Sequence, residues 1–176
     1  MTAGQEAASL PAIYALSTGL AGDVLLMPCP SPGEALERAM RALVRRDAGM
    51  VLSLLPDDEA EFLGVANEAE VAAQCGLDFR SFPIEDRSAP KVPGEIVPLL
   101  EELLARLREG EHVAVHCRAG IGRTGLVASG LLVWLGRTAD EACAIVSAVR
   151  GEAVPEVEVQ GAFVTALAGL RKPTPA

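Results

Sequence analysis

The stretch HVAVHCRAGIGRTGLVASGLLVWL, residues 112–135, decides the fold. Residues 112–116 have the pattern of a short strand, and residues 126–135 form an apolar run that is typical of a buried helix. A glycine-rich loop between them places Cys117 six positions before Arg123. A strand, a tight loop and a helix in this order leave free backbone N–H groups and the positive end of a helix facing into the loop. The sequence therefore predicts an anion-binding loop between a strand and a helix.

The loop begins with a thiol and ends with a guanidinium. The field that binds an anion also favours the thiolate of Cys117, which is the nucleophilic form of cysteine. We expect Gly120 and Gly122 to let the backbone turn so that successive N–H groups converge. Arg123 offers a planar fork that matches two phosphate oxygens, and the Thr124 hydroxyl is placed to hydrogen-bond the sulfur and help it leave in a second step. A phosphate-binding loop with its own nucleophile indicates a phosphatase site.

Residues 116–125, HCRAGIGRTG, resemble the signature of the cysteine-dependent protein tyrosine phosphatases, in the dual-specificity-like branch that includes kinase-associated phosphatases. The resemblance covers roughly residues 50–170. It implies that Cys117 forms a phosphocysteine, that Arg123 holds the phosphoryl oxygens and that His116 orients the loop. It also implies a reaction without metal or organic cofactor. The resemblance places the phosphate on the loop residues Arg118, Ala119, Gly120, Ile121 and Gly122; the side chain of Arg118 contacts further substrate groups or only solvent.

The family supplies a proton to the leaving oxygen from an aspartate on a separate loop. Residues 82–90, FPIEDRSAP, resemble the Pro-Ile-x-Asp pattern of the dual-specificity branch. We expect Asp86 to be the general acid, although such a residue is also common in an ordinary turn. Glu85 is the rival, because adjacent side chains in an extended chain point in opposite directions. The tryptophan that begins this loop in the tyrosine-specific branch is absent. Gln160 is a candidate for positioning the attacking water, with an ordinary position on a helix surface as the alternative.

The rest of the chain alternates between strand and helix patterns. We expect strands at 13–16, 24–27, 50–55, 77–84 and 112–116, and helices at 33–46, 57–74, 94–108, 124–135, 140–149 and 157–170. This order predicts an α/β fold with a central, mostly parallel sheet of about four to five strands flanked by helices. Residues 1–176 are expected to form a single domain with flexible ends at 1–10 and 171–176. Ligands bind such sheets at the carboxyl ends of the strands, where Cys117 falls.

Composition and charge exclude several classes of function. With 15 basic and 24 acidic residues, the net charge of -9 argues against a nucleic-acid binder and against docking on an anionic membrane. The longest apolar run, residues 126–135, has half the length of the ~20 residues that span a bilayer. Residues 1–10 show no secretory signal, so we expect a cytoplasmic protein. Two histidines and four separate cysteines argue against structural zinc. We expect Cys29, Cys75 and Cys143 to be small buried apolar residues, and a redox disulfide with Cys117 stays open.

The pattern as a whole predicts a protein phosphatase that hydrolyses phosphotyrosine, with phosphoserine and phosphothreonine as further substrates to test. Its partner would be a phosphorylated protein, and its oligomeric state is not specified by the sequence. A phosphoinositide or a small phosphate ester is the alternative substrate, although relatives that act on lipids often carry lysine inside the loop, where this chain has Ile121. A phosphopeptide-binding module without turnover and a sulfur- or arsenate-handling enzyme are the other classes of function, and the pattern favours them less.

Overall fold

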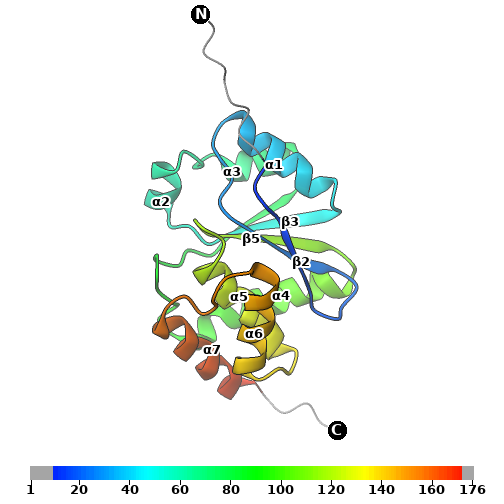
Figure 1. Cartoon of the computed structure of the whole chain (residues 1–176). Helices are drawn as coiled ribbons and strands as arrows, with labels where there is room; N and C mark the ends of the chain where they lie inside the picture. Colours follow the sequence, from blue (N-terminus) through cyan, green and yellow to red (C-terminus); the bar gives the residue numbers. More distant parts are fainter. Residues whose placement is uncertain (1–9, 172–176) are drawn as a thin grey trace, which may run out of the picture.

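A five-stranded sheet with helices on both faces forms the centre of the molecule (Figure 1). The computed structural model describes residues 10–171, so the ends expected to be flexible lie outside the described residues apart from Leu10 and Arg171. The strands are β1 (Tyr14–Ser17), β2 (Asp23–Met27), β3 (Ala48–Ser53), β4 (Asp78–Ser81) and β5 (His112–His116). Their order is β1-β2-β5-β3-β4, and only the β1–β2 pair is antiparallel. The expected α/β fold with a mostly parallel sheet is confirmed.

The helices form two layers around this sheet. They are α1 (Glu34–Val44), α2 (Asp57–Phe62), α3 (Glu68–Gln74), α4 (Val97–Arg108), α5 (Gly122–Trp134), α6 (Ala139–Arg150) and α7 (Glu158–Leu170), with a 3-10 helix at Pro93–Ile96 before α4. Helices α1 to α3 lie on one side of the sheet and α4 to α7 on the other (Figure 1). None of the helices within residues 10–171 is long and apolar enough to cross a membrane.

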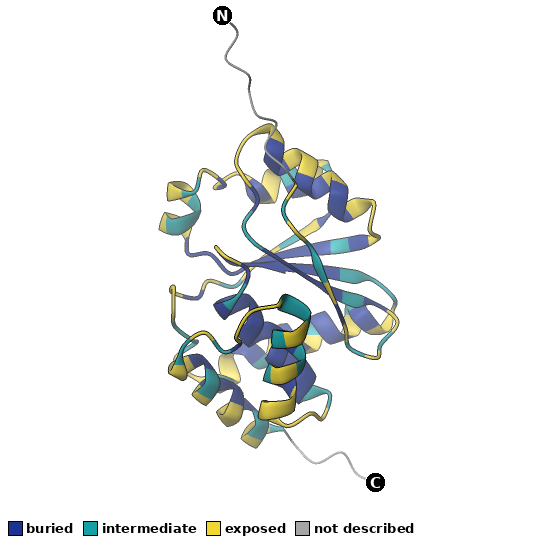
Figure 2. Ribbon diagram, in the orientation of Figure 1, coloured by how far each residue is buried: buried dark blue, intermediate teal, exposed yellow. Residues whose placement is uncertain are grey.

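The central strand β5 is buried on both faces because its side chains alternate between the two layers. Val113 and Val115 pack into the core formed with α4 to α7, whereas Ala114 packs into the core formed with α1 and α3. Figure 2 shows the central strands of the sheet and the inward faces of the helices as buried and the outer helix faces as exposed, and the edge strands β1 and β4 are largely not buried. The same alternation sends His116 towards α3 and Cys117 towards α5. The two neighbouring residues of the loop therefore enter different environments.

Six of the expected elements differ from the structure by two residues or more. The strand expected over 50–55 lies at Ala48–Ser53, the helix expected over 33–46 ends at Val44, and the helix expected over 94–108 begins as a 3-10 helix. The helix expected over 57–74 is two helices, because Gly64 adopts a left-handed φ of 75° that interrupts the acidic stretch. The strand expected over 77–84 ends at Ser81, shortly before Pro83, which has no N–H to donate to β3. Helix α5 begins inside the loop at Gly122 rather than at Thr124. The break between α2 and α3, the end of β4 and the start of α5 all lie near the carboxyl end of β5, where the site lies.

The other three cysteines are half-buried and pack against the two cores rather than inside them, so the expectation of small buried residues is met only in part. Cys29, Cys75 and Cys143 have intermediate exposure, and all four thiols are free. Cys75 lies at the C-terminal cap of α3 and Cys29 in the chain that leaves β2, and such ends of elements are covered on one side only. Within the described residues, only the thiol of Cys117 is buried.

Candidate active site

The nucleophile candidate lies at the carboxyl end of the central strand. His116 is the last residue of β5 and pairs with Met27 of β2 and Ser53 of β3. The next residue, Cys117, is only 2% exposed and lies at the start of the loop. The backbone is fixed on both sides, since Leu54 N–H donates to the His116 carbonyl at 3.0 Å and Cys29 N–H donates to the Arg118 carbonyl at 3.0 Å. The sheet therefore holds the thiol in place before any substrate arrives.

The two glycines of the loop have different surroundings and different backbone conformations. Gly120 has a φ of 68°, and a Cβ there would collide with the backbone carbonyl of Met27. Gly122 needs no left-handed conformation, because it is the first residue of α5. Instead, the ends of the Glu156 and Gln160 side chains lie against it, and a Cβ there would displace them. The structure thus gives Gly120 a left-handed turn and a close backbone approach, whereas Gly122 is in contact only with side chains that can move.

Arg150 on α6 supports the loop from the outside. Its Nε donates to the Gly120 carbonyl at 2.7 Å and its guanidinium to the Ala119 carbonyl at 3.0 Å, while the group lies 4.2 Å from the centre of the Tyr14 ring. In a planar trans peptide the N–H points opposite to the C=O. The N–H groups that follow these two carbonyls therefore point away from Arg150. Sequence reasoning missed this role, because Arg150 lies 27 residues from the loop's end with no local pattern to mark it.

The guanidinium of Arg123 is held in one orientation by a carboxylate. Arg123 is 2% exposed, and its two terminal nitrogens donate to both oxygens of Glu59 at 2.6 and 2.9 Å. It also donates to the Ile84 carbonyl at 3.0 Å. Burial lowers the pKa of Arg123, but the hydrogen bond with Glu59 and the nearby anionic groups outweigh burial and raise it. The same hydrogen bond lowers the pKa of Glu59. Such a bidentate pair pre-orients the fork before a phosphate binds.

The loop after β4 brings Asp86 to this guanidinium. Oδ1 of Asp86 lies 3.2 Å from Nη2 of Arg123. The neighbouring Arg87 has a φ of 53° and forms an ion pair with Glu156 at 3.2 Å, so this loop is attached to the segment before α7. Glu85 is exposed and does not line the cavity over the thiol. Of the two carboxylates that the sequence left open, Asp86 is the one that lies at the cavity.

These groups surround a cavity of about 250 Å³. It is lined by the loop residues Cys117, Arg118, Ala119, Gly122 and Arg123, by Asp86 and Arg87, and by Glu156. Two residues of the loop do not line the cavity: Gly120 is buried, and Ile121 is half-buried against the core. The arrangement joins a thiol, a fixed guanidinium and an exposed carboxylate, which are the groups needed to attack a phosphate ester, hold its oxygens and protonate its leaving group.

Two further predicted residues lie close to the loop in environments that the sequence did not indicate. Gln160 is fully buried, so the alternative of an ordinary helix-surface position is wrong. Its amide donates to the Ser88 carbonyl at 3.4 Å and accepts from the Glu156 N–H at 3.2 Å. The Thr124 hydroxyl is buried without a hydrogen-bond partner among residues 10–171. Its hydrogen bond to the sulfur stays a prediction.

His116 is buried and lies between two oxygen acceptors. Its Nδ1 lies 3.1 Å from the Cys117 carbonyl, and its Nε2 lies 2.9 Å from Oε1 of Glu68, which is also buried. Burial alone would lower the pKa of His116, but interactions with Cys29 and Glu68 outweigh burial and raise it from 6.5 to about 10. A raised folded-state pKa stabilises the fold fully below pH 6.5, and this contribution is lost as the pH rises towards 10.

An exposed aromatic ring lies beside the loop. Phe62 ends α2 and is 78% exposed, and the guanidinium of Arg118 lies 5.9 Å from the centre of its ring. Arg118 in turn lines the cavity. Sequence reasoning did not select Phe62, because nothing in the acidic stretch around it indicates that the end of this helix approaches a loop more than 50 residues away.

Comparisons with known proteins find a family model and several relatives with similar sequences. A family model described as "Polymorphic toxin system, DSP-PTPase phosphatase" matches residues 27–137. The human cyclin-dependent kinase inhibitor 3 is 34% identical over 74 residues, which are 42% of this chain and 34% of that protein. The mouse protein tyrosine phosphatase domain-containing protein 1 is 30% identical over 149 residues, which are 78% of this chain and 20% of that protein. The chain thus spans about a third and a fifth of the lengths of these two relatives.

Solved structures show the same fold. A kinase associated phosphatase with its catalytic-site cysteine substituted by serine superposes with a TM-score of 0.84 at 19% identity, covering 94% of this chain and 99% of that one. The active form of Tk-PTP superposes with a TM-score of 0.73 at 27% identity, covering 89% of this chain and 97% of that one.

Proposed function

Because the chain belongs to the DSP-PTPase family of phosphatases, we propose that it hydrolyses phosphotyrosine on a protein substrate through a phosphocysteine intermediate. The thiolate of Cys117 attacks phosphorus and forms the S–P bond as the ester P–O bond breaks. Asp86 gives its proton to the tyrosine oxygen that leaves. Water then attacks the phosphocysteine, its proton returns to Asp86, and inorganic phosphate and the thiolate are released.

The observation that supports this proposal most directly is the placement of three groups from distant parts of the chain at one cavity. Cys117 and Arg123 come from the loop after β5, and Asp86 from the loop after β4. Arg123 is already held by Glu59 in the orientation of a bidentate fork. Preorganised donors of this kind are usually the largest single contribution to catalysis of group transfer. The thiolate must stay reduced to act, and we therefore also propose a cytoplasmic location.

The overall proposal is tested with a matched panel of substrates. Phosphotyrosine, phosphoserine and phosphothreonine versions of one peptide and a dispersed phosphoinositide would be compared by release of inorganic phosphate, with a metal chelator present. We expect turnover to be highest on the phosphotyrosine peptide and to be unchanged by the chelator. Higher kcat/KM on the phosphoinositide would replace the protein substrate with a lipid headgroup, and no turnover on any member would leave only a binding module.

Replacing Asp86 with asparagine is expected to lower kcat by about 10²-fold on a phosphopeptide. The loss should be much smaller on p-nitrophenyl phosphate, because p-nitrophenolate leaves readily without a proton. The basic limb of the kcat profile should also flatten, since the group that donates the proton is gone. Steady-state kinetics on both substrates between pH 5 and 8 provide the measurement.

Glu85→Gln is the matched control for this variant, because it removes the neighbouring carboxylate, which does not line the cavity. We expect it to keep both activities. If Glu85→Gln loses the peptide activity while Asp86→Asn keeps it, the proton donor is Glu85 and the assignment of Asp86 is wrong.

Replacing Phe62 with alanine is expected to lower kcat/KM for the phosphotyrosine peptide by about tenfold and to leave phosphoserine turnover unchanged. The reason is that its exposed ring, next to Arg118, offers a stacking surface to the substrate ring, and aromatic pairs contribute about 0.5–1.5 kcal/mol beyond buried area. Val44→Ala is the control, since Val44 is also exposed but lies at the end of α1, shortly before the amino end of β3. An equal loss on both peptides would exclude selective ring recognition.

A further inference from the structure

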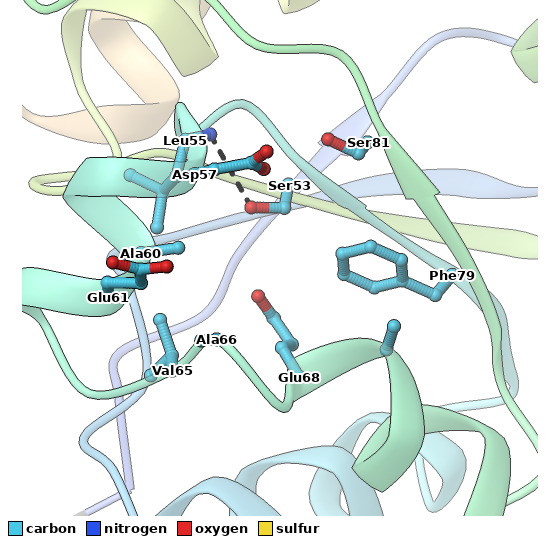
Figure 3. Close-up of a pocket in the computed structure, with 11 residues that line it drawn as sticks. Ser53, Leu55, Asp57, Ala60, Glu61, Val65, Ala66, Glu68, Phe79 and Ser81 are labelled. Carbon is cyan, nitrogen blue, oxygen red and sulfur yellow. Dashed lines mark hydrogen bonds between the residues drawn. The ribbon is translucent and has the colours of Figure 1, made fainter.

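A second cavity of about 250 Å³ lies between α2, α3 and the carboxyl ends of β3 and β4. Figure 3 shows Glu68, from the start of α3, pointing into this cavity towards Ser53. Glu68 is 3% exposed, although carboxylates are almost never buried to this degree without a partner. The other carboxylates at the cavity are Asp57 and Glu61 on α2, and none of the residues that line it is basic. The positive charge that would balance Glu68 must therefore come from outside the lining of the cavity.

His116 supplies that charge from the adjacent strand. Both of its ring nitrogens lie near oxygen acceptors, with Nδ1 3.1 Å from the Cys117 carbonyl and Nε2 2.9 Å from Oε1 of Glu68. Nε2 of His116 and Oε1 of Glu68 are buried without a hydrogen-bond partner among the described residues, so it is opposite charge that would compensate their close approach. With Glu68 ionised, a lone pair on either ring nitrogen would face an oxygen lone pair, so both nitrogens would carry a hydrogen and the ring would be an imidazolium. His112 at the other end of β5 is in the opposite situation, because its Nδ1 accepts the N–H of Asp23 at 2.8 Å and so carries no hydrogen.

From this geometry we propose that Glu68 is a positioning residue of the active site, which keeps the buried ring of His116 positively charged and so favours the thiolate of Cys117. The proposal rests on the function proposed above only for its consequence in turnover. The ionisable groups that face His116 are Glu68 of α3 and Cys29 of the chain after β2, whereas its contact with Cys117 is to the backbone carbonyl of that residue. A cation next to the start of the loop stabilises negative charge on the sulfur, as an adjacent cation does for other reactive cysteines.

The first test uses the unaltered protein and needs no catalytic activity. Only two histidines are present in the chain, so their ring nitrogens can be followed individually by ¹⁵N NMR between pH 5.5 and 8.5. We expect one ring, His116, to stay doubly protonated across this range and the other, His112, to show an unprotonated Nδ1 at neutral pH. A neutral ring at His116 at pH 7 would overturn the proposal, whether or not the protein proves to be a phosphatase.

The second test measures how fast iodoacetamide alkylates Cys117, followed by mass spectrometry of the peptide that contains it. In Glu68→Gln the His116 ring should lose its positive charge. Because the thiolate of Cys117 then lacks this nearby opposite charge, we expect the midpoint of the alkylation rate against pH to rise by about one unit. Glu61→Gln removes a carboxylate from the same cavity without a contact to His116, and should leave the midpoint unchanged. Equal midpoints in Glu68→Gln and in the unaltered protein would show that Glu68 does not act on the thiol.

A third comparison separates an effect through His116 from a loss of structure. In a His116→Asn background the ring charge is absent, so adding Glu68→Gln should shift the midpoint no further. An additional shift would show that Glu68 acts by another route and would refute the positioning role. Should Glu68→Gln not fold, Glu68→Asp keeps the charge and should retain the original midpoint, and the NMR result on the unaltered protein still decides the case.

Discussion

Replacing Cys117 with serine is expected to lower kcat by at least about 10⁴-fold, because the S–P bond of the intermediate cannot form and a serine hydroxyl is not ionised at neutral pH. The two side chains differ by one atom, and the residue is 2% exposed, so the loop should keep its conformation. The measurement is turnover of p-nitrophenyl phosphate and of a phosphotyrosine peptide. Binding of vanadate should persist, since the loop amides and Arg123 remain.

Cys75→Ser is the matched control for this exchange. Cys75 is half-buried at the end of α3, has a free thiol and lies outside the cavity over the loop. We expect it to retain full activity. Measurable turnover by the Cys117→Ser protein at more than a hundredth of the original rate would mean that another group attacks phosphorus, and the phosphocysteine mechanism would have to be abandoned.

Replacing Arg123 with lysine is expected to lower kcat/KM by about 10²–10³-fold although the positive charge is retained. The ammonium group cannot reproduce the fork that binds both oxygens of Glu59 and, at the same time, the Ile84 carbonyl. It would therefore present a single point charge to the phosphoryl group, which needs two aligned donors in the transition state. The loss should fall mainly on kcat, because the loop N–H groups still bind the ground-state phosphate.

Two further variants serve as comparisons for Arg123→Lys. Glu59→Gln leaves Arg123 intact but weakens its anchor, and we expect a smaller loss of about tenfold. Arg38→Lys, in an exposed ion pair with Glu34 on α1, should have no effect. If Arg123→Lys instead raises KM with kcat unchanged, the fork contributes only to uniform binding of substrate and product.

The loop itself could be predicted because its reactive residues lie close together in the sequence. Cys117 and Arg123 lie on one short segment between a strand and a helix, so the pattern of that segment defines both their spacing and their surroundings. The mostly parallel pairing of the sheet followed for a similar reason, since the alternation of strands and helices indicates parallel strands, whereas the order of the strands was not predicted. Residues 50–55, apolar except for Ser53, predicted a strand buried on both faces, and β3 forms there but begins and ends two residues earlier.

The residues that hold the loop in position could not be predicted, because they come from separate elements. The stretch 57–61 contains four carboxylates, and only the rotation of α2 determines that Glu59 is the one that meets Arg123. The division of residues 57–74 into two helices places Glu68 against His116, and that division depends on a single glycine. Gln160 belongs to a helix whose inward face could not be known without its packing partner, and its burial was therefore missed.

Helix α2 has six residues, and none of them is buried, yet it carries the carboxylate that fixes Arg123 and the ring beside Arg118. A segment this short gains little from its own hydrogen bonds and has few apolar contacts with the rest of the molecule. Elements of this kind open with much less free energy than global unfolding requires. On warming, the protein should therefore lose the alignment of its Arg123 guanidinium while the sheet is still intact, and we expect the proposed activity to fall at a lower temperature than that at which the core melts.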